Sequence, residues 1–220
     1  MMCACQPLKT MALRHWQRRG RLTLSCALLW LISLPSGLFA DQPPAFTLTD
    51  VTAESGIHFV HSTGGSGEGY IVEGMSAGLA TLDYNGDGWM DIYFLNGAAL
   101  KGTTVDVPLR NSLYRNNGDW TFTDVTEEAG VGDLGYGLGV GVADYDGDGD
   151  ADIYINNFGP NVLYRNEGNG TFTNVAAAAG VDNGDKVGAG VGFLDIEGDG
   201  DLDLYVANYV DFTYDNYIPI

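Results

Sequence analysis

The chain has 220 residues, with 29 Asp and Glu against 10 Lys and Arg. All the acids lie from Asp41 onward, where only five of the bases remain, so these 180 residues carry a net charge of −24. Phosphate backbones and anionic lipid repel such a charge, which argues against a nucleic-acid partner and against electrostatic membrane binding.

Residues 1–40 have the pattern of a secretory signal peptide. Five bases accompany an apolar run from Leu22 to Leu34, and the small residue Ala40 precedes the acidic part of the chain. The apolar run has about 13 residues, fewer than the roughly 20 that span a bilayer. Cleavage after Ala40 would leave a domain at 41–220 without a membrane span, exported to the extracellular space or the periplasm and cell envelope. A retained signal anchor is the alternative, and either Met1 or Met11 could be the start.

The three cysteines, Cys3, Cys5 and Cys26, all lie in this leader. The exported domain would therefore have no disulfide, no zinc–thiolate site and no cysteine nucleophile. Its rigidity must come from another source.

An Asp-rich loop of nine residues occurs three times, at 83–91, 144–152 and 195–203. A run rich in Gly, Ala and Val precedes each loop, and a short apolar run follows it at 92–96, 153–157 or 204–208. Such short runs, bounded by Gly, Asn and Asp, are typical of β-strands and hairpins. The spacing predicts repeated structural units instead of one continuous domain.

A second element recurs between the loops. Leu-Tyr-Arg-Asn occurs at 113–116 and 163–166, and Thr-Phe-Thr followed by Asp or Asn and then Val occurs at 121–125 and 171–175. We expect turns at 116–119 and 166–170 and short helices at 125–129 and 175–179. A partial copy of the end of this element lies at 49–57, and the first unit has about ten extra residues near 98–108.

Each unit therefore has about four short strands in roughly 50 residues, the size of one β-propeller blade. The Gly-rich strand before each loop suits an inner position, where neighbouring blades leave no room for large side chains. The predicted fold is all-β, with about three four-stranded blades.

The loops have the oxygen pattern of a Ca²⁺ site. Positions 1, 3, 5 and 9 carry oxygen side chains, and Ca²⁺ takes six to eight oxygen ligands from a tightly curled loop. The curl requires positive φ at position 6, which is Gly88, Gly149 or Gly200. Position 7 would supply only its backbone carbonyl, from Trp89, Asp150 or Asp201.

Two other kinds of metal site fit the loops less well, and a loop that binds no metal remains an alternative. The helix-loop-helix calcium hand needs Glu at position 12, where this chain has Phe94, Ile155 or Val206. Mg²⁺ retains several waters and is rarely enclosed by protein ligands alone. The remaining alternative is that the loops are Asp- and Gly-rich hairpin turns that bind no metal.

Taken together, these motifs resemble the FG-GAP/VCBS repeats of integrin-α-like β-propellers. The Leu-Tyr-Arg-Asn and Thr-Phe-Thr elements make the chain most similar to the secreted ASPIC/UnbV-associated proteins related to cartilage acidic protein. That resemblance implies a Ca²⁺ site in each loop. The side-chain ligands would be Asp83, Asn85, Asp87 and Asp91; Asp144, Asp146, Asp148 and Asp152; and Asp195, Glu197, Asp199 and Asp203.

The resemblance also implies about seven blades, so we expect the chain to be a C-terminally truncated fragment whose remaining blades come from missing sequence. Phe158-Gly159-Pro160 is only a fragment of the family's Phe-Gly and Gly-Ala-Pro signatures.

Other motifs suggest catalysis more weakly. Gly74-Met-Ser-Ala-Gly78 matches a nucleophile elbow, but the repeat places Gly137 where this motif has Ser76, and a strand follows it instead of a helix. His58 and His61 lie in a possible strand and could bind a metal or polarise a substrate, although a half-exposed strand pair is the commoner explanation.

The sequence therefore predicts an exported, non-catalytic, Ca²⁺-binding propeller module for cell adhesion or for binding an extracellular protein or carbohydrate. The alternatives are the propeller part of a secreted hydrolase or redox enzyme, and a structural component of a surface layer.

Overall fold

The structure, a computed structural model, describes residues 48–75 and 77–218. The chain divides into two units, Met1–Leu48 and Thr49–Ile220. Of the first unit, only Leu48 is among the described residues. The predicted signal peptide lies outside the described residues. No helix in the described ranges is long and apolar enough to cross a membrane.

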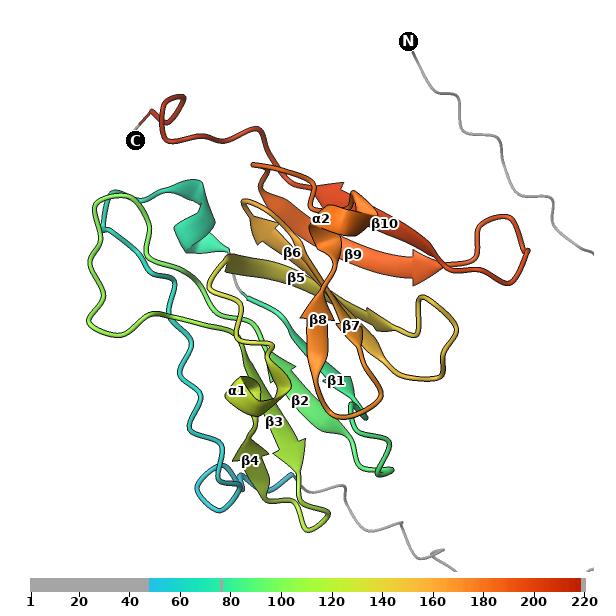
Figure 1. Cartoon of the computed structure of the whole chain (residues 1–220). Helices are drawn as coiled ribbons and strands as arrows, with labels where there is room; N and C mark the ends of the chain where they lie inside the picture. The colour runs from blue at the N-terminus through green and yellow to red at the C-terminus, as the bar shows by residue number, and fades with distance from the viewer. Residues whose placement is uncertain (1–47, 76, 219–220) are drawn as a thin grey trace, which may run out of the picture. The chain divides into compact units, whose positions relative to one another are not determined.

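The strands form three antiparallel sheets, which we call blades 1, 2 and 3 (Figure 1). Blade 1 contains β1 (Leu79–Leu82), β2 (Asp91–Phe94), β3 (Ser112–Asn116) and β4 (Phe122–Asp124). Blade 2 contains β5 (Tyr136–Ala143), β6 (Asp152–Phe158), β7 (Val162–Asn166) and β8 (Phe172–Asn174). Blade 3 contains β9 (Gly188–Leu194) and β10 (Asp203–Asn208). The fold is all-β, as predicted, and blades 1 and 2 have the up-and-down strand order of propeller blades.

Short helices link the blades. The helix α1 (Thr126–Ala129) follows blade 1 and α2 (Ala176–Ala179) follows blade 2, while a 3₁₀ helix, η1 (Ile71–Gly74), precedes β1. The two α-helices lie within the predicted ranges. The extra residues of the first unit lie in the connection between β2 and β3, and residues 95–111 contain no strand or helix.

The hydrophobic core lies between the blades. Leu82, Leu95 and Val131 of the first repeat pack with Ile153 and Ile155 of blade 2 in one buried cluster. A tyrosine in the second strand of each of these two blades also closes its own linker. The Tyr93 hydroxyl donates to the Val131 carbonyl at 2.7 Å, and its repeat equivalent, Tyr154, donates to Val181 at 2.6 Å.

The Gly-rich strands lie where the blades approach one another, as predicted, and β5 packs against both β1 and β9. A Cβ on Gly139 would lie 2.1 Å from the Ala189 carbonyl oxygen of β9, and one on Gly137 would lie 3.1 Å from Leu95 Cβ. Only glycine, which has no Cβ, allows the strands of neighbouring blades to approach this closely.

The partial repeat at 49–57 folds like its equivalent in blade 1. The Ser55 amide donates to the Val51 carbonyl at 3.0 Å, as Ala129 donates to Val125 at 2.8 Å in α1. This turn contacts β4, where the Phe122 amide donates to the Ser55 carbonyl at 2.7 Å. The turn thus precedes blade 1 as α1 precedes blade 2.

One local prediction is wrong. Residues 57–61, which hold His58 and His61, do not form a strand. They occupy the position of the linker at 131–135, so the two histidines do not belong to a sheet.

Candidate metal centre

Each Asp loop joins the first and second strands of its blade. The loops at 83–91, 144–152 and 195–203 therefore lie along one side of the described unit (Figure 1). The repeat thus brings three chemically similar loops to equivalent places.

The first aspartate of each loop fixes the curl. In blade 2, Asp144 Oδ1 accepts the amides of Gly147 at 2.8 Å and Asp148 at 3.0 Å, while Oδ2 accepts the amide of Gly149 at 2.9 Å. Gly149 has φ of 97°, and Gly88 and Gly200 also have positive φ, as predicted. The glycines at position 4, including Gly147 with φ of 75°, need the same conformation, which we did not predict.

The last aspartate of the loop is buried. Asp152 has no exposed surface, and its Oδ2 accepts the Tyr145 amide at 3.0 Å while its Oδ1 accepts the Asn166 amide at 2.8 Å. The equivalent Asp91 of blade 1 makes the same two bonds, from Tyr84 at 3.1 Å and Asn116 at 2.7 Å. This residue therefore ties the loop to the third strand of the blade.

Burial also changes the acidity of this residue. The pKa of Asp152 is raised to about 6. Loss of hydration is the main cause and the nearby Asp146 and Asp148 add to it, while the two amide hydrogen bonds act in the opposite direction. Burial likewise raises the pKa of Asp91. An ionised carboxylate here lacks sufficient compensating positive charge, which a cation would supply.

The carboxylates of blade 2 converge on one point. Asp144, Asp146 and Asp152 each offer an oxygen, and these atoms lie within 4.8 Å of one another. An all-oxygen set of this kind fits a hard cation such as Ca²⁺. The fourth predicted side-chain ligand, Asp148, is not part of this cluster, and its Oδ1 accepts the Asp150 amide at 2.9 Å.

The other two loops keep the curl but not this convergence. Within the described ranges, no second group of three acidic or His side chains meets the same distance limit. In loop 83–91 the Asn85 side chain donates to Asp87 Oδ2 at 2.9 Å. In loop 195–203 the residues up to Asp201 are exposed, Glu197 among them, and Asp203 is only half-buried. Asp203 accepts one amide, from Ile196, because the described residues place no third strand beside β10.

Position 7 has a packing role that we did not predict. The Trp89 indole lies against Gly118 of the β3–β4 turn, where an added Cβ would be 3.0 Å from its Nε1 atom. The equivalent Asp150 carboxylate would be 2.6 Å from a Cβ on Gly168 of the β7–β8 turn. Asp201 has no such turn beside it in the described part of the chain.

Asn116 and Asn166 are the site residues that sequence reasoning missed. Besides bonding the closing aspartate, Asn166 donates its side-chain amide to the Tyr84 carbonyl at 2.8 Å and so ties the loop of blade 1 to blade 2. The repetition of Asn at the end of both Leu-Tyr-Arg-Asn motifs was the available signal.

The residues that suggested catalysis are Ser76, His58 and His61. Ser76 lies outside the described residues. His58 and His61 are both exposed.

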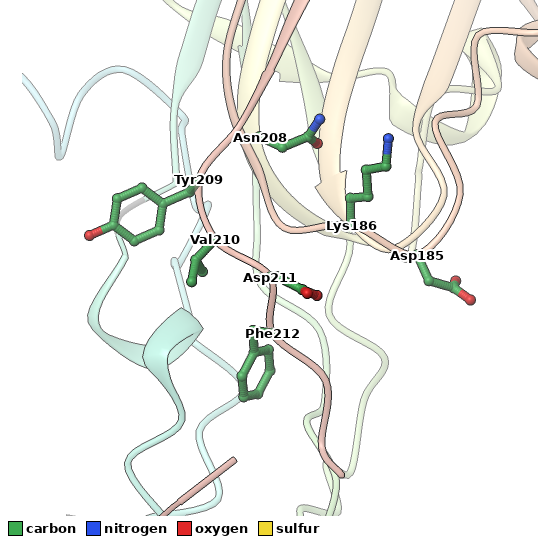
Figure 2. A pocket seen from close by; sticks show the side chains of 7 residues that line it. All are labelled: Asp185, Lys186, Asn208, Tyr209, Val210, Asp211 and Phe212. Carbon is green, nitrogen blue, oxygen red and sulfur yellow. The ribbon is translucent and has the colours of Figure 1, made fainter. Parts of the chain in front are cut away.

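A surface hollow lies at the end of the β9–β10 hairpin opposite its Asp loop (Figure 2). It has a volume of about 360 Å³, and Figure 2 shows Lys186 and Asn208 directed the same way while Tyr209 points elsewhere. Asn183 joins the first two, because its Oδ1 accepts Lys186 Nζ at 3.1 Å and its amide donates to Asn208 Oδ1 at 2.8 Å. The lining combines carboxylates, a cation, an amide and aromatic rings.

A family model described as FG-GAP-like repeat matches residues 83–155 and 144–206. Each match begins at the first aspartate of one loop and ends in the strand after the next loop. The chain belongs to the FG-GAP-like repeat family. No curated protein matches the chain at a significant level. Membership and the observed sheets together describe a β-propeller-like repeat module, in which the Asp triad of blade 2 could hold a metal.

Proposed function

We propose that this FG-GAP-like repeat chain is an exported, non-catalytic module that binds Ca²⁺ in its Asp loops. It would present an extracellular surface for adhesion or for binding a protein or carbohydrate. The observation that carries the proposal is the convergence of Asp144, Asp146 and Asp152 in a loop whose curl is already formed.

Ca²⁺ suits this site better than a proton or a water molecule does. When bound, it supplies positive charge beside Asp152, whose ionised form is disfavoured by burial and by the neighbouring carboxylates. Asp144 and Asp152 are held in place by backbone amides and the exposed Asp146 completes the cluster, so little reordering is required. Asp83, Asn85, Asp87 and Asp91, with the Trp89 carbonyl, would form the equivalent site in blade 1. Asp195, Glu197, Asp199 and Asp203, with the Asp201 carbonyl, would form the third.

The loops lie beside the contacts between blades, so metal binding would strengthen the module as a whole. The Tyr84 carbonyl in the first loop accepts the Asn166 side chain of blade 2, and the Tyr84 ring stacks near Phe172 at 6.3 Å. All three cysteines lie within residues 1–40, so the exported domain would have no disulfide. Bound Ca²⁺ would give it rigidity instead. The hollow beside Tyr209 is the surface we propose for ligand contact, since it combines polar groups with exposed aromatic area.

Replacing Asp146 by Asn tests the metal site without disturbing the fold. Asp146 is exposed, and no hydrogen bond of the described residues involves its carboxylate. We expect calorimetric titration with CaCl₂ to show one fewer bound ion, or at least about tenfold weaker binding at one site, which is about 1.4 kcal/mol. The melting temperature in chelator should be unchanged or slightly higher, because like charges are removed.

Asp185→Asn is the matched control. It removes the same charge from an exposed position at the other end of the hairpin and should bind Ca²⁺ as the unmodified protein does. Equal Ca²⁺ uptake by Asp146→Asn and Asp185→Asn would count against the proposal.

A further inference from the structure

The face of blade 3 that points away from blade 2 is apolar, and no other described part of the chain covers it. It forms a shallow groove of about 490 Å³ lined by Gly190, Val191, Gly192, Leu194, Tyr205 and Ala207. Tyr205 is 64% exposed, and no atom lies within 4 Å of a Cβ placed on Gly190 or Gly192. A soluble protein rarely leaves such a face of a sheet without a partner.

Blade 3 packs on the equivalent face of blade 2. Gly139 and Gly141 occupy the places of Gly190 and Gly192, and a Cβ on Gly141 would lie 3.1 Å from Val191 Cγ1. Tyr154 occupies the place of Tyr205, yet it is 0% exposed and its hydroxyl bonds the Val181 carbonyl. Blade 3 therefore carries one half of an interface whose complete form exists between blades 2 and 3.

Blade 1 carries the other half. Leu79 of β1 occupies the place of Val140 and Val191, the side chains that pack against the glycines of the preceding blade. A Cβ on Gly78, for example, would lie 3.6 Å from Val140 Cγ1. Leu79 itself is 58% exposed.

The segment that precedes blade 1 also has the structure of a linker between blades. The turn at 51–56 is seated on β4, as described above, and the next residue, Ile57, occupies the place of Val131 and Val181. Those two carbonyls accept the hydroxyls of Tyr93 and Tyr154. Tyr205 is the third tyrosine of this series, and its matching carbonyl is that of Ile57.

We propose that a second copy of this chain docks head-to-tail on blade 3. The Leu79 face of one copy packs on the Gly190 and Gly192 face of the other, and the Tyr205 hydroxyl donates to the Ile57 carbonyl of that copy. The contact continues the existing blade-to-blade interface across two molecules. Because the two faces differ, the contact is heterologous, and repetition closes a ring or extends a filament.

Charge sets the conditions for this association. The residues that form the two faces are uncharged, but each copy carries −24 over residues 41–220. Repulsion between copies is therefore strong at low ionic strength and is screened at about 0.15 M salt, where the Debye length is roughly 8 Å. We expect association to strengthen with added NaCl.

Sedimentation equilibrium of the purified protein in 0.15 M NaCl, with two single variants, tests the proposal. Leu79→Arg blocks one face and Gly192→Arg blocks the other. Both positions are open within one copy, and the backbone at Gly192 does not have positive φ, so each variant should fold. Ala178→Arg adds the same charge at an exposed position on α2 and serves as the control.

The unmodified protein and Ala178→Arg should show a weight-average mass that rises with concentration to at least twice that of one chain. Each blocked variant alone should remain a single chain, with an unchanged circular dichroism spectrum. An equimolar mixture of Leu79→Arg and Gly192→Arg should form a heterodimer and nothing larger, since one intact pair of faces remains. A single-chain mass for the unmodified protein at every concentration, or a mixture that stays unassociated, would overturn the proposal.

Discussion

Replacing Asp152 by Ala should lower the free energy of unfolding in Ca²⁺ by about 3 to 5 kcal/mol. The buried amide of Asn166 and the part-buried amide of Tyr145 both lose their acceptor, at about 1 to 3 kcal/mol each. Loss of a Ca²⁺ ligand adds to this. In chelator the effect should be smaller, because the substitution also removes a carboxylate whose pKa burial raises to about 6. Urea unfolding with and without Ca²⁺ measures both quantities.

Asp203→Ala provides the comparison within the same molecule. Asp203 is the repeat equivalent of Asp152, but it is half-buried and accepts one amide, from Ile196 at 3.0 Å. We expect a loss of about 1 kcal/mol. Equal losses for the two variants would show that the contact with the third strand does not matter.

The second large effect should come from Gly139. A Cβ there would lie 2.1 Å from the Ala189 carbonyl oxygen, which is backbone and cannot rotate away. Gly139→Ala must therefore push β9 from β5, and we expect a loss of about 3 kcal/mol, at the upper end of overpacking effects. Chemical unfolding monitored by tyrosine and tryptophan fluorescence measures it.

Gly190→Ala is the matched control, since Gly190 occupies the same place in blade 3 and its Cβ would meet no atom within 4 Å. At concentrations where the chain is monomeric, its stability should stay within about 1 kcal/mol of the unmodified protein. A loss as large as that of Gly139→Ala would mean that the strand needs glycine for its own conformation and not for the neighbouring blade.

The sequence was informative wherever a local pattern repeats. The nine-residue loops predicted the positions of the first-to-second-strand connections, and Gly149 predicted the positive φ that closes the curl. Val125–Ala129 predicted α1 because the segment recurs at 175–179 in the next repeat. In each case the residues that decide the structure are neighbours in the chain.

The parts that could not be predicted depend on residues far apart in sequence. Asn166 meets the Tyr84 carbonyl, 82 positions away, only after both blades have formed. Trp89 contacts Gly118 across a hairpin whose register the sequence does not specify. His58 and His61 show the converse error, because a short segment rich in Ile, Phe and Val looks like a strand when its place in the repeat is ignored.

Thermal unfolding of the protein in millimolar Ca²⁺ and in chelator tests the central claim most directly. One ion at a concentration 100-fold above its dissociation constant adds about 2.7 kcal/mol. For a chain of this size that raises the melting temperature by roughly 5 to 10 °C, and more if further loops bind. Mg²⁺ at the same concentration should give a smaller rise. The account predicts a clear separation between the Ca²⁺ and chelator midpoints, and coincident midpoints would contradict it.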